Sequence, residues 1–195
     1  MDARELRELL ERVARGEAPV EDALSRLSDL PFGEVSVGDL DVARIDHHRE
    51  LRTGFPEVVF CQGKSPLQVR AIAREMLDKG DVLLGTRASA AHFQVVAQIA
   101  GDARFFEDAR ILLVDRRSER PRRGHIVVAS GGTADFPVAE EAAISAEVMG
   151  NRVTRLYDVG VAGVHRVLAN RDLLREARAI IAVAGMEGAL PSIVA

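Results

Sequence analysis

The sequence predicts an α/β protein in which a helical and small α/β N-terminal domain precedes a doubly wound, flavodoxin-like domain with a parallel sheet. Apolar, strand-like runs alternate with helix-like segments along most of the chain, which is typical of α/β folds. The runs in the second half are apolar almost throughout, and such strands favour a parallel sheet covered on both faces. A charged, proline-bearing stretch, RRSERPRRG, separates the two halves.

The N-terminal domain is expected to cover residues 1–118 and to begin with helices within 1–30. Leucines and a valine recur at helical spacing over 2–15, and a second apolar stripe fits 20–28. The charged segment that follows, 31–53, is less regular. We therefore predict two short helices and then a stretch without a clear element.

A small α/β unit is expected over 55–115. The predicted elements, in order, are strand EVVF, a helix over Ser65–Lys79, strand DVLLGT, a helix over 88–100 and strand ARILLVD. Ser65 is a good helix cap, and the proline after it fits the first helical turn.

Residues 119–124 are expected to form a linker, and 125–195 the second domain. Its predicted elements are strand HIVVAS, a helix over Pro137–Met149, strand RVTRLYDV, one or two helices over 163–177, strand AIIAVAG and a helix starting near Gly188. Right-handed crossovers would make this domain doubly wound. Three strands make a thin sheet, so we expect the C-terminal part of the domain to be missing.

Composition narrows the classes of function. The 195 residues carry a net charge of −4 and few aromatic residues, which disfavours a nucleic-acid partner. The single cysteine suits a reducing compartment, and the charged, amphipathic start is not a secretory signal. We therefore expect a cytoplasmic protein without a membrane partner.

The loop after strand HIVVAS is the first candidate site. Glycines allow backbone N–H groups to approach an anion, hydroxyl groups can donate to phosphate, and the following helix adds partial positive charge. An ordinary strand-to-helix turn explains the same composition, and the aspartate could cap the helix or bind a sugar hydroxyl. The residues concerned are Ser130, Gly131, Gly132, Thr133, Ala134, Asp135 and Pro137.

Two more loops follow predicted strand ends, where ligands collect in open parallel sheets. The string YDVGVAGVHR places His165 and Arg166 where they could bind a phosphate or a carboxylate. The string AGMEGALP places Glu187 between two glycines, where it could act as a general base in a closed site. A surface histidine and a solvated glutamate are the plain alternatives.

The two adjacent histidines and the single cysteine are weaker candidates for a functional site. His47 and His48 are adjacent, so they lack the spacing of a helical metal site, and we predict no protein metal site. Cys61 lies near Lys64, which could activate the thiol, but a buried, inert cysteine is the simpler interpretation.

The strings SGGTADFPVAEEA, YDVGVAGVHR and VAGMEGALPSIVA, in this order, resemble the pyridinium-3,5-biscarboxylic acid mononucleotide synthase of nickel-pincer cofactor biosynthesis, the LarB family. DHHRELRTGFPEVVFCQGKSP resembles the N-terminal segment of that family, so the likeness covers most of the chain. The catalytic half is similar in turn to the carboxylase that acts on aminoimidazole ribonucleotide.

The resemblance implies carboxylation of the pyridinium ring of nicotinic acid adenine dinucleotide, with carbon dioxide or bicarbonate as co-substrate, and hydrolysis of its phosphoanhydride to release AMP. Glu187 would be the base. The residues implied in nucleotide binding are Ser130, Gly131, Gly132, Thr133, Ala134, Asp135, Pro137, Asp158, Gly163, His165, Arg166, Gly185 and Met186. No tightly bound cofactor is expected, although Mg²⁺ could offset the pyrophosphate charge, and relatives with this core imply a homo-oligomer.

The sequence departs from the family pattern in two ways. The family usually has serine where this chain has Ala134, so one hydroxyl is missing from the loop. The family's nucleophilic cysteine lies downstream of MEGALPS and is not within these residues, and Cys61 should not be substituted for it. An aminoimidazole ribonucleotide carboxylase or mutase, or a nucleotide-binding module without chemistry, remain the alternatives.

Overall fold

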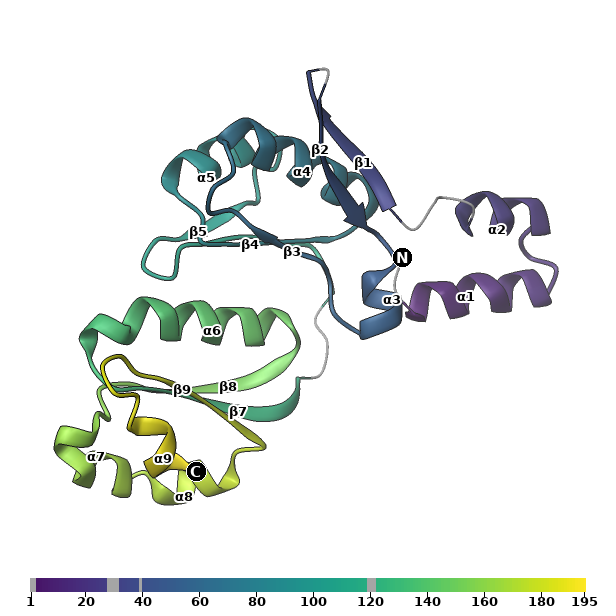
Figure 1. Cartoon of the computed structure of the whole chain (residues 1–195). Helices are drawn as coiled ribbons and strands as arrows, with labels where there is room; N and C mark the ends of the chain where they lie inside the picture. Colours follow the sequence, from purple (N-terminus) through teal and green to yellow (C-terminus); the bar gives the residue numbers. More distant parts are fainter. Residues whose placement is uncertain (1–2, 28–31, 39, 119–121) are drawn as a thin grey trace.

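A computed structural model of the chain describes residues 3–27, 32–38, 40–118 and 122–195 (Figure 1). The predicted N-terminal helices are present as α1 (Ala3–Ala14) and α2 (Val20–Leu27). No described helix combines the length and the apolar character that crossing a bilayer requires.

An antiparallel hairpin occupies much of the segment that the sequence left without a clear element. Strand β1 (Phe32–Val37) pairs with β2 (Leu40–Asp46), and the short helix α3 (Arg49–Thr53) follows. The pairing register shifts between Val35 and Ser36. That irregularity and the charged residues obscure the alternation, while Val35 and Ile45 on the inner face enter the hydrophobic core.

The N-terminal sheet has the strand order β3-β4-β6-β5. Its elements are β3 (Val58–Phe60), α4 (Pro66–Lys79), β4 (Val82–Thr86), α5 (Ala90–Ala97), β5 (Arg104–Phe106) and β6 (Ile111–Asp115). Ser65 caps α4 as predicted, accepting from the Gln68 backbone N–H. The three-residue β5 was not predicted, and β6 runs antiparallel to β4.

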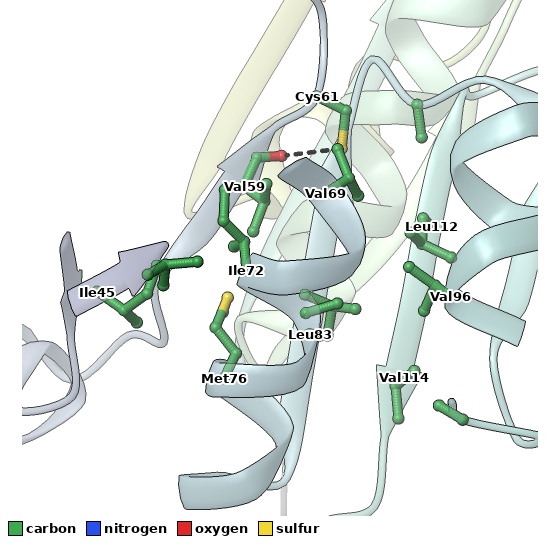
Figure 2. Packing of buried hydrophobic residues seen from close by; sticks show 14 residues of the cluster. Ile45, Val59, Cys61, Val69, Ile72, Met76, Leu83, Val96, Leu112 and Val114 are labelled. Carbon is green, nitrogen blue, oxygen red and sulfur yellow. Dashed lines mark hydrogen bonds between the residues drawn. The ribbon is translucent and has the colours of Figure 1, made fainter. Parts of the chain in front are cut away.

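Helix α4 covers the buried core of this sheet (Figure 2). Its residues Val69, Ile72 and Met76 pack with Leu83 and Leu112 from the strands. Because these side chains recur every three or four residues, one face of α4 supplies them all.

The second sheet is parallel, with the strand order β8-β7-β9, and confirms the predicted α/β class. Its strands are β7 (Arg123–Ser130), β8 (Asn151–Leu156) and β9 (Ala179–Val183). Its helices are α6 (Phe136–Val148), α7 (Val164–Leu168), α8 (Arg171–Glu176) and α9 (Leu190–Val194), with single 3-10 turns at Thr133–Asp135 (η1) and Val161–Gly163 (η2).

Helix α6 lies between the two sheets (Figure 1). Ala139 and Ala143 pack against the parallel sheet, while Ile144 and Val148 pack against the N-terminal sheet. Two contacts align the helix with that sheet. Near its middle Glu141 forms an ion pair with Arg87, which follows β4, and at its end the Val148 carbonyl accepts from Arg117. Apolar residues on two sides of α6 allow it to pack against both sheets.

Candidate functional site

The three predicted loops meet at the carboxyl edge of the parallel sheet. The Gly131 N–H donates to the Val183 carbonyl at the end of β9, and the Val159 N–H donates to the Ser130 carbonyl, both at 2.9 Å. The central loop, Ser130–Asp135, is therefore tied to the loop on each side. The structure brings together the loops that carry the sequence-predicted residues, as the ligand-binding edge of an open parallel sheet requires.

Ser130 is the most buried polar residue at this edge. Its side chain is fully buried, and its Oγ has no hydrogen-bond partner among the described residues. Alternation along β7 puts Ser130 on the same face as Val128, toward α6. A buried hydroxyl without a partner is costly, so we expect a water molecule or a ligand group to hydrogen-bond to this oxygen.

Asp135 shapes the central loop from within. Its Oδ2 accepts from the Gly132 N–H at 2.9 Å, and a Cβ added at Gly131 would lie 3.0 Å from the same oxygen. Its Oδ1 faces the third loop, 3.8 Å from a Cβ built at Gly185. Part of the carboxylate's accepting capacity is thus used locally.

Three other predicted residues of this loop face solvent. Thr133 and Ala134 are exposed on the 3-10 turn, and Pro137 is exposed in the first turn of α6. The turn thus carries one exposed hydroxyl, on Thr133, and a methyl group at Ala134.

The second loop presses against the first at a glycine that was not singled out from the sequence. A Cβ added at Gly160 would lie 2.6 Å from the Gly131 carbonyl oxygen. The string YDVGVAG contains two glycines, which indicate a tight loop. Only the contact in the structure shows that Gly160 is the one that must lack a side chain.

Arg166 and Asp158 form an ion pair at the mouth of the second loop. Arg166 Nη1 donates to Asp158 Oδ2 at 2.5 Å, and Asp158 has a left-handed backbone with φ of 56°. The guanidinium lies over Gly163, where an added Cβ would be 2.7 Å from Arg166 Nε. His165 is exposed on α7, and its side chain forms no hydrogen bond or ion pair with the described residues.

The third loop is the most open of the three. Met186 is 98% exposed and has a left-handed φ of 52°, and Gly185 and Glu187 are exposed beside it. Glu187 thus lies in solvent in this chain, and its role as a base stays a prediction.

Cys61 is buried in the N-terminal core, as Figure 2 shows, with its thiol donating to the Val59 carbonyl. Burial raises the pKa of the Cys61 thiol to about 11, against a smaller lowering by Lys64. The predicted inert cysteine agrees with this position, and a thiol in that state is a poor nucleophile.

The adjacent histidines lie apart from the parallel sheet. His47 Nε2 is 3.0 Å from Glu75 Oε1, where Lys79 also approaches. The described ranges contain no group of three or more histidine, cysteine, aspartate or glutamate side chains able to hold a metal ion.

Two comparisons with known proteins bear on identity. Residues 37–117 match the family model of the LarB/PurE-like N-terminal domain. The chain is also 29% identical over 203 residues to an uncharacterized protein of Methanocaldococcus jannaschii, covering 97% of this chain and 76% of that protein. A LarB/PurE-like domain indicates an enzyme of the carboxylase or mutase type. The match supports a relation of segment 37–117 to the LarB/PurE family.

Proposed function

We propose that the protein takes part in carboxylating the pyridinium ring of nicotinic acid adenine dinucleotide and in hydrolysing its phosphoanhydride, which gives pyridinium-3,5-biscarboxylic acid mononucleotide and AMP. The observation that carries the proposal is the buried, unpartnered Ser130 hydroxyl, which lies beneath a glycine loop where three strand ends meet. A phosphoribosyl group could satisfy this hydroxyl while its sugar meets Asp135.

The chemistry sets requirements on the site. A pyridinium ring is electron-poor, so a nucleophile must first add to a ring carbon and convert the ring into an enamine. The enamine carbon then attacks carbon dioxide and forms the new carbon–carbon bond. A base removes the proton from that carbon, the nucleophile leaves with its electron pair, and aromaticity returns. Water separately attacks the phosphoanhydride, which releases AMP.

The residues of this chain fit some of these roles. Arg166, held by Asp158, offers a fixed guanidinium for an anionic group of the substrate. Glu187 is the proposed base, on a loop that adjoins the central one. Cys61 does not fit the nucleophile, because it is buried in the other domain. By resemblance, the nucleophile is a cysteine downstream of MEGALPS. Magnesium would accompany the pyrophosphate of the substrate.

We also propose that the protein is a homo-oligomer. Large apolar side chains are exposed on the elements around the three loops: Val138, Val164, Leu168 and Met186. Exposed apolar side chains of this kind are often buried at an interface between subunits. Light scattering coupled to size exclusion is expected to show a defined oligomer, and a stable monomer of the intact protein would contradict this.

The experiment incubates the 195-residue chain, and any longer product of the same gene, with nicotinic acid adenine dinucleotide and bicarbonate. Release of AMP together with a carboxylated mononucleotide is the expected result. Turnover of aminoimidazole ribonucleotide instead would overturn the proposal and favour the mutase-type alternative, which the same three loops permit. Retained dinucleotide binding without turnover in any form would favour a binding module.

A further inference from the structure

The ion pair between Asp158 and Arg166 stands out from the other surface pairs because the local backbone is built around it. Asp158 adopts a left-handed φ of 56°, a conformation that non-glycine residues adopt only at a cost. Gly163 leaves the space that the guanidinium fills, since an added Cβ would lie 2.7 Å from Nε and 3.0 Å from Nη2. Two local features thus converge on one orientation of Arg166.

The stability of the fold does not explain this arrangement. The Arg166 and Asp158 side chains are 38% and 63% exposed, and exposed ion pairs contribute little to stability. The pair instead fixes a flexible side chain at the edge of the candidate site. Val159, the residue after Asp158, donates to the Ser130 carbonyl, so the loop that holds Arg166 is anchored to the central loop.

We propose that Asp158 is a positioning residue that holds the Arg166 guanidinium ready for an anionic pair of oxygens on the substrate. This inference rests on the proposed function. The anionic group is either the ring carboxylate or the nucleotide phosphate, since a guanidinium fork suits both. Asp158 itself acts through Arg166.

The choice of variants separates this role from a backbone role. Asp158→Asn keeps a residue that tolerates the left-handed conformation and removes only the negative charge. Asp158→Gly relieves the backbone cost and also removes the carboxylate. If the backbone conformation were the important property, Asp158→Gly would bind ligand as well as the wild type. Under the proposal, both variants lose affinity to a similar extent.

The experiment measures dissociation constants of nicotinic acid adenine dinucleotide and its nicotinamide counterpart by calorimetry, with Asp172→Asn as the control. Asp172 also pairs with an arginine, Arg171, but at an exposed position of helix α8. We expect roughly tenfold weaker binding in Asp158→Asn and Asp158→Gly, because a charge-assisted hydrogen bond is misplaced. The control is expected to bind like the wild type, and thermal unfolding of all variants is expected to stay close to that of the wild type.

A double-mutant cycle with Arg166→Gln gives the decisive test. If Asp158 acts through Arg166, then Asp158→Asn has no further effect once Arg166 is replaced. Weakening of the nicotinate ligand alone would assign the ring carboxylate, and equal weakening of both ligands would assign the phosphate. Unchanged affinity in Asp158→Asn, or additive losses in the double variant, would overturn the inference. A wild-type protein that binds both dinucleotides without turning them over contradicts the proposed function, while the cycle still measures the coupling.

Discussion

Gly160 packs against the Gly131 carbonyl so closely that a Cβ on residue 160 would lie 2.6 Å from that oxygen. This contact sets the distance between the first two loops of the candidate site. The oxygen belongs to the main chain, and the N–H groups on either side of it, of Gly131 and Gly132, donate to Val183 and Asp135. It therefore cannot move aside as the end of a flexible side chain would.

We therefore expect Gly160→Ala to weaken dinucleotide binding by roughly tenfold to a hundredfold, since small displacements of positioning groups have effects of that size. The matched control is Gly101→Ala, in the N-terminal domain and away from the three loops. No atom lies within 4 Å of a Cβ added at Gly101, and its backbone is not left-handed. Isothermal calorimetry is the measurement. Equal binding by the two variants would show that loop spacing does not matter.

The interface between the two sheets makes a prediction about stability. Ile144→Ala is expected to lower the free energy of unfolding by roughly 2–5 kcal/mol, because it leaves a cavity between α6 and the N-terminal sheet. Leu67→Ala, on α4 and 61% exposed, is expected to change it little. Urea denaturation followed by circular dichroism compares them. A similar, small effect of both substitutions would mean that α6 does not couple the two sheets.

Cys61 provides a test by reactivity and pH. Its pKa of about 11, raised by burial, keeps the thiol protonated at pH 8 in the folded protein. Since the unfolded thiol ionises near pH 9, stability linked to Cys61 is complete below that pH and is lost as pH rises toward about 11.

We expect a thiol reagent such as Ellman's to react with the folded protein at least about a hundredfold more slowly than with urea-unfolded protein. The chain contains one cysteine, so the signal has one source. Rapid reaction of the folded protein would show that Cys61 is accessible, and it would contradict the conclusion that Cys61 does not fit the role of nucleophile.

A substitution of Glu187 tests whether this residue acts as a base or only binds the substrate. In a form of the protein that turns over the dinucleotide, Glu187→Gln is expected to reduce carboxylation far more than binding, because the amide cannot accept the ring proton. Glu176→Gln, at an exposed position near the end of α8, serves as the control. Parallel measurement of product formation and dissociation constants decides the matter, and an equal loss of both would identify Glu187 as a binding residue.

The sequence predicted the parallel domain well because its strands are largely apolar and glycines mark the loops that follow them. It predicted the N-terminal sheet less completely. The order β-α-β-α-β does not show that β6 runs antiparallel to β4, and three-residue β5 is too short to give a periodic signal. The β1–β2 hairpin is stabilised by packing of Val35 and Ile45 in the core, which no local pattern reveals.

In the candidate site, too, local sequence patterns predicted some features, and others depend on tertiary contacts. Sequence strings identified the three loops and most of their polar residues. The closeness of Gly160 to Gly131 and the clamp of Asp158 on Arg166 depend on how separate loops fold against each other. Such contacts become visible only when the strand ends are brought together.

The position of α6 between the two sheets has a consequence for synthesis on the ribosome. The whole N-terminal sheet is made before α6, so Leu84 and Ile111 have no cover from this helix until the chain has grown past Val148. A nascent chain in that interval exposes an apolar sheet face, and such surfaces attract chaperones or aggregate. Once α6 has been synthesised and has packed on the N-terminal sheet, this apolar face is covered and the risk of aggregation falls.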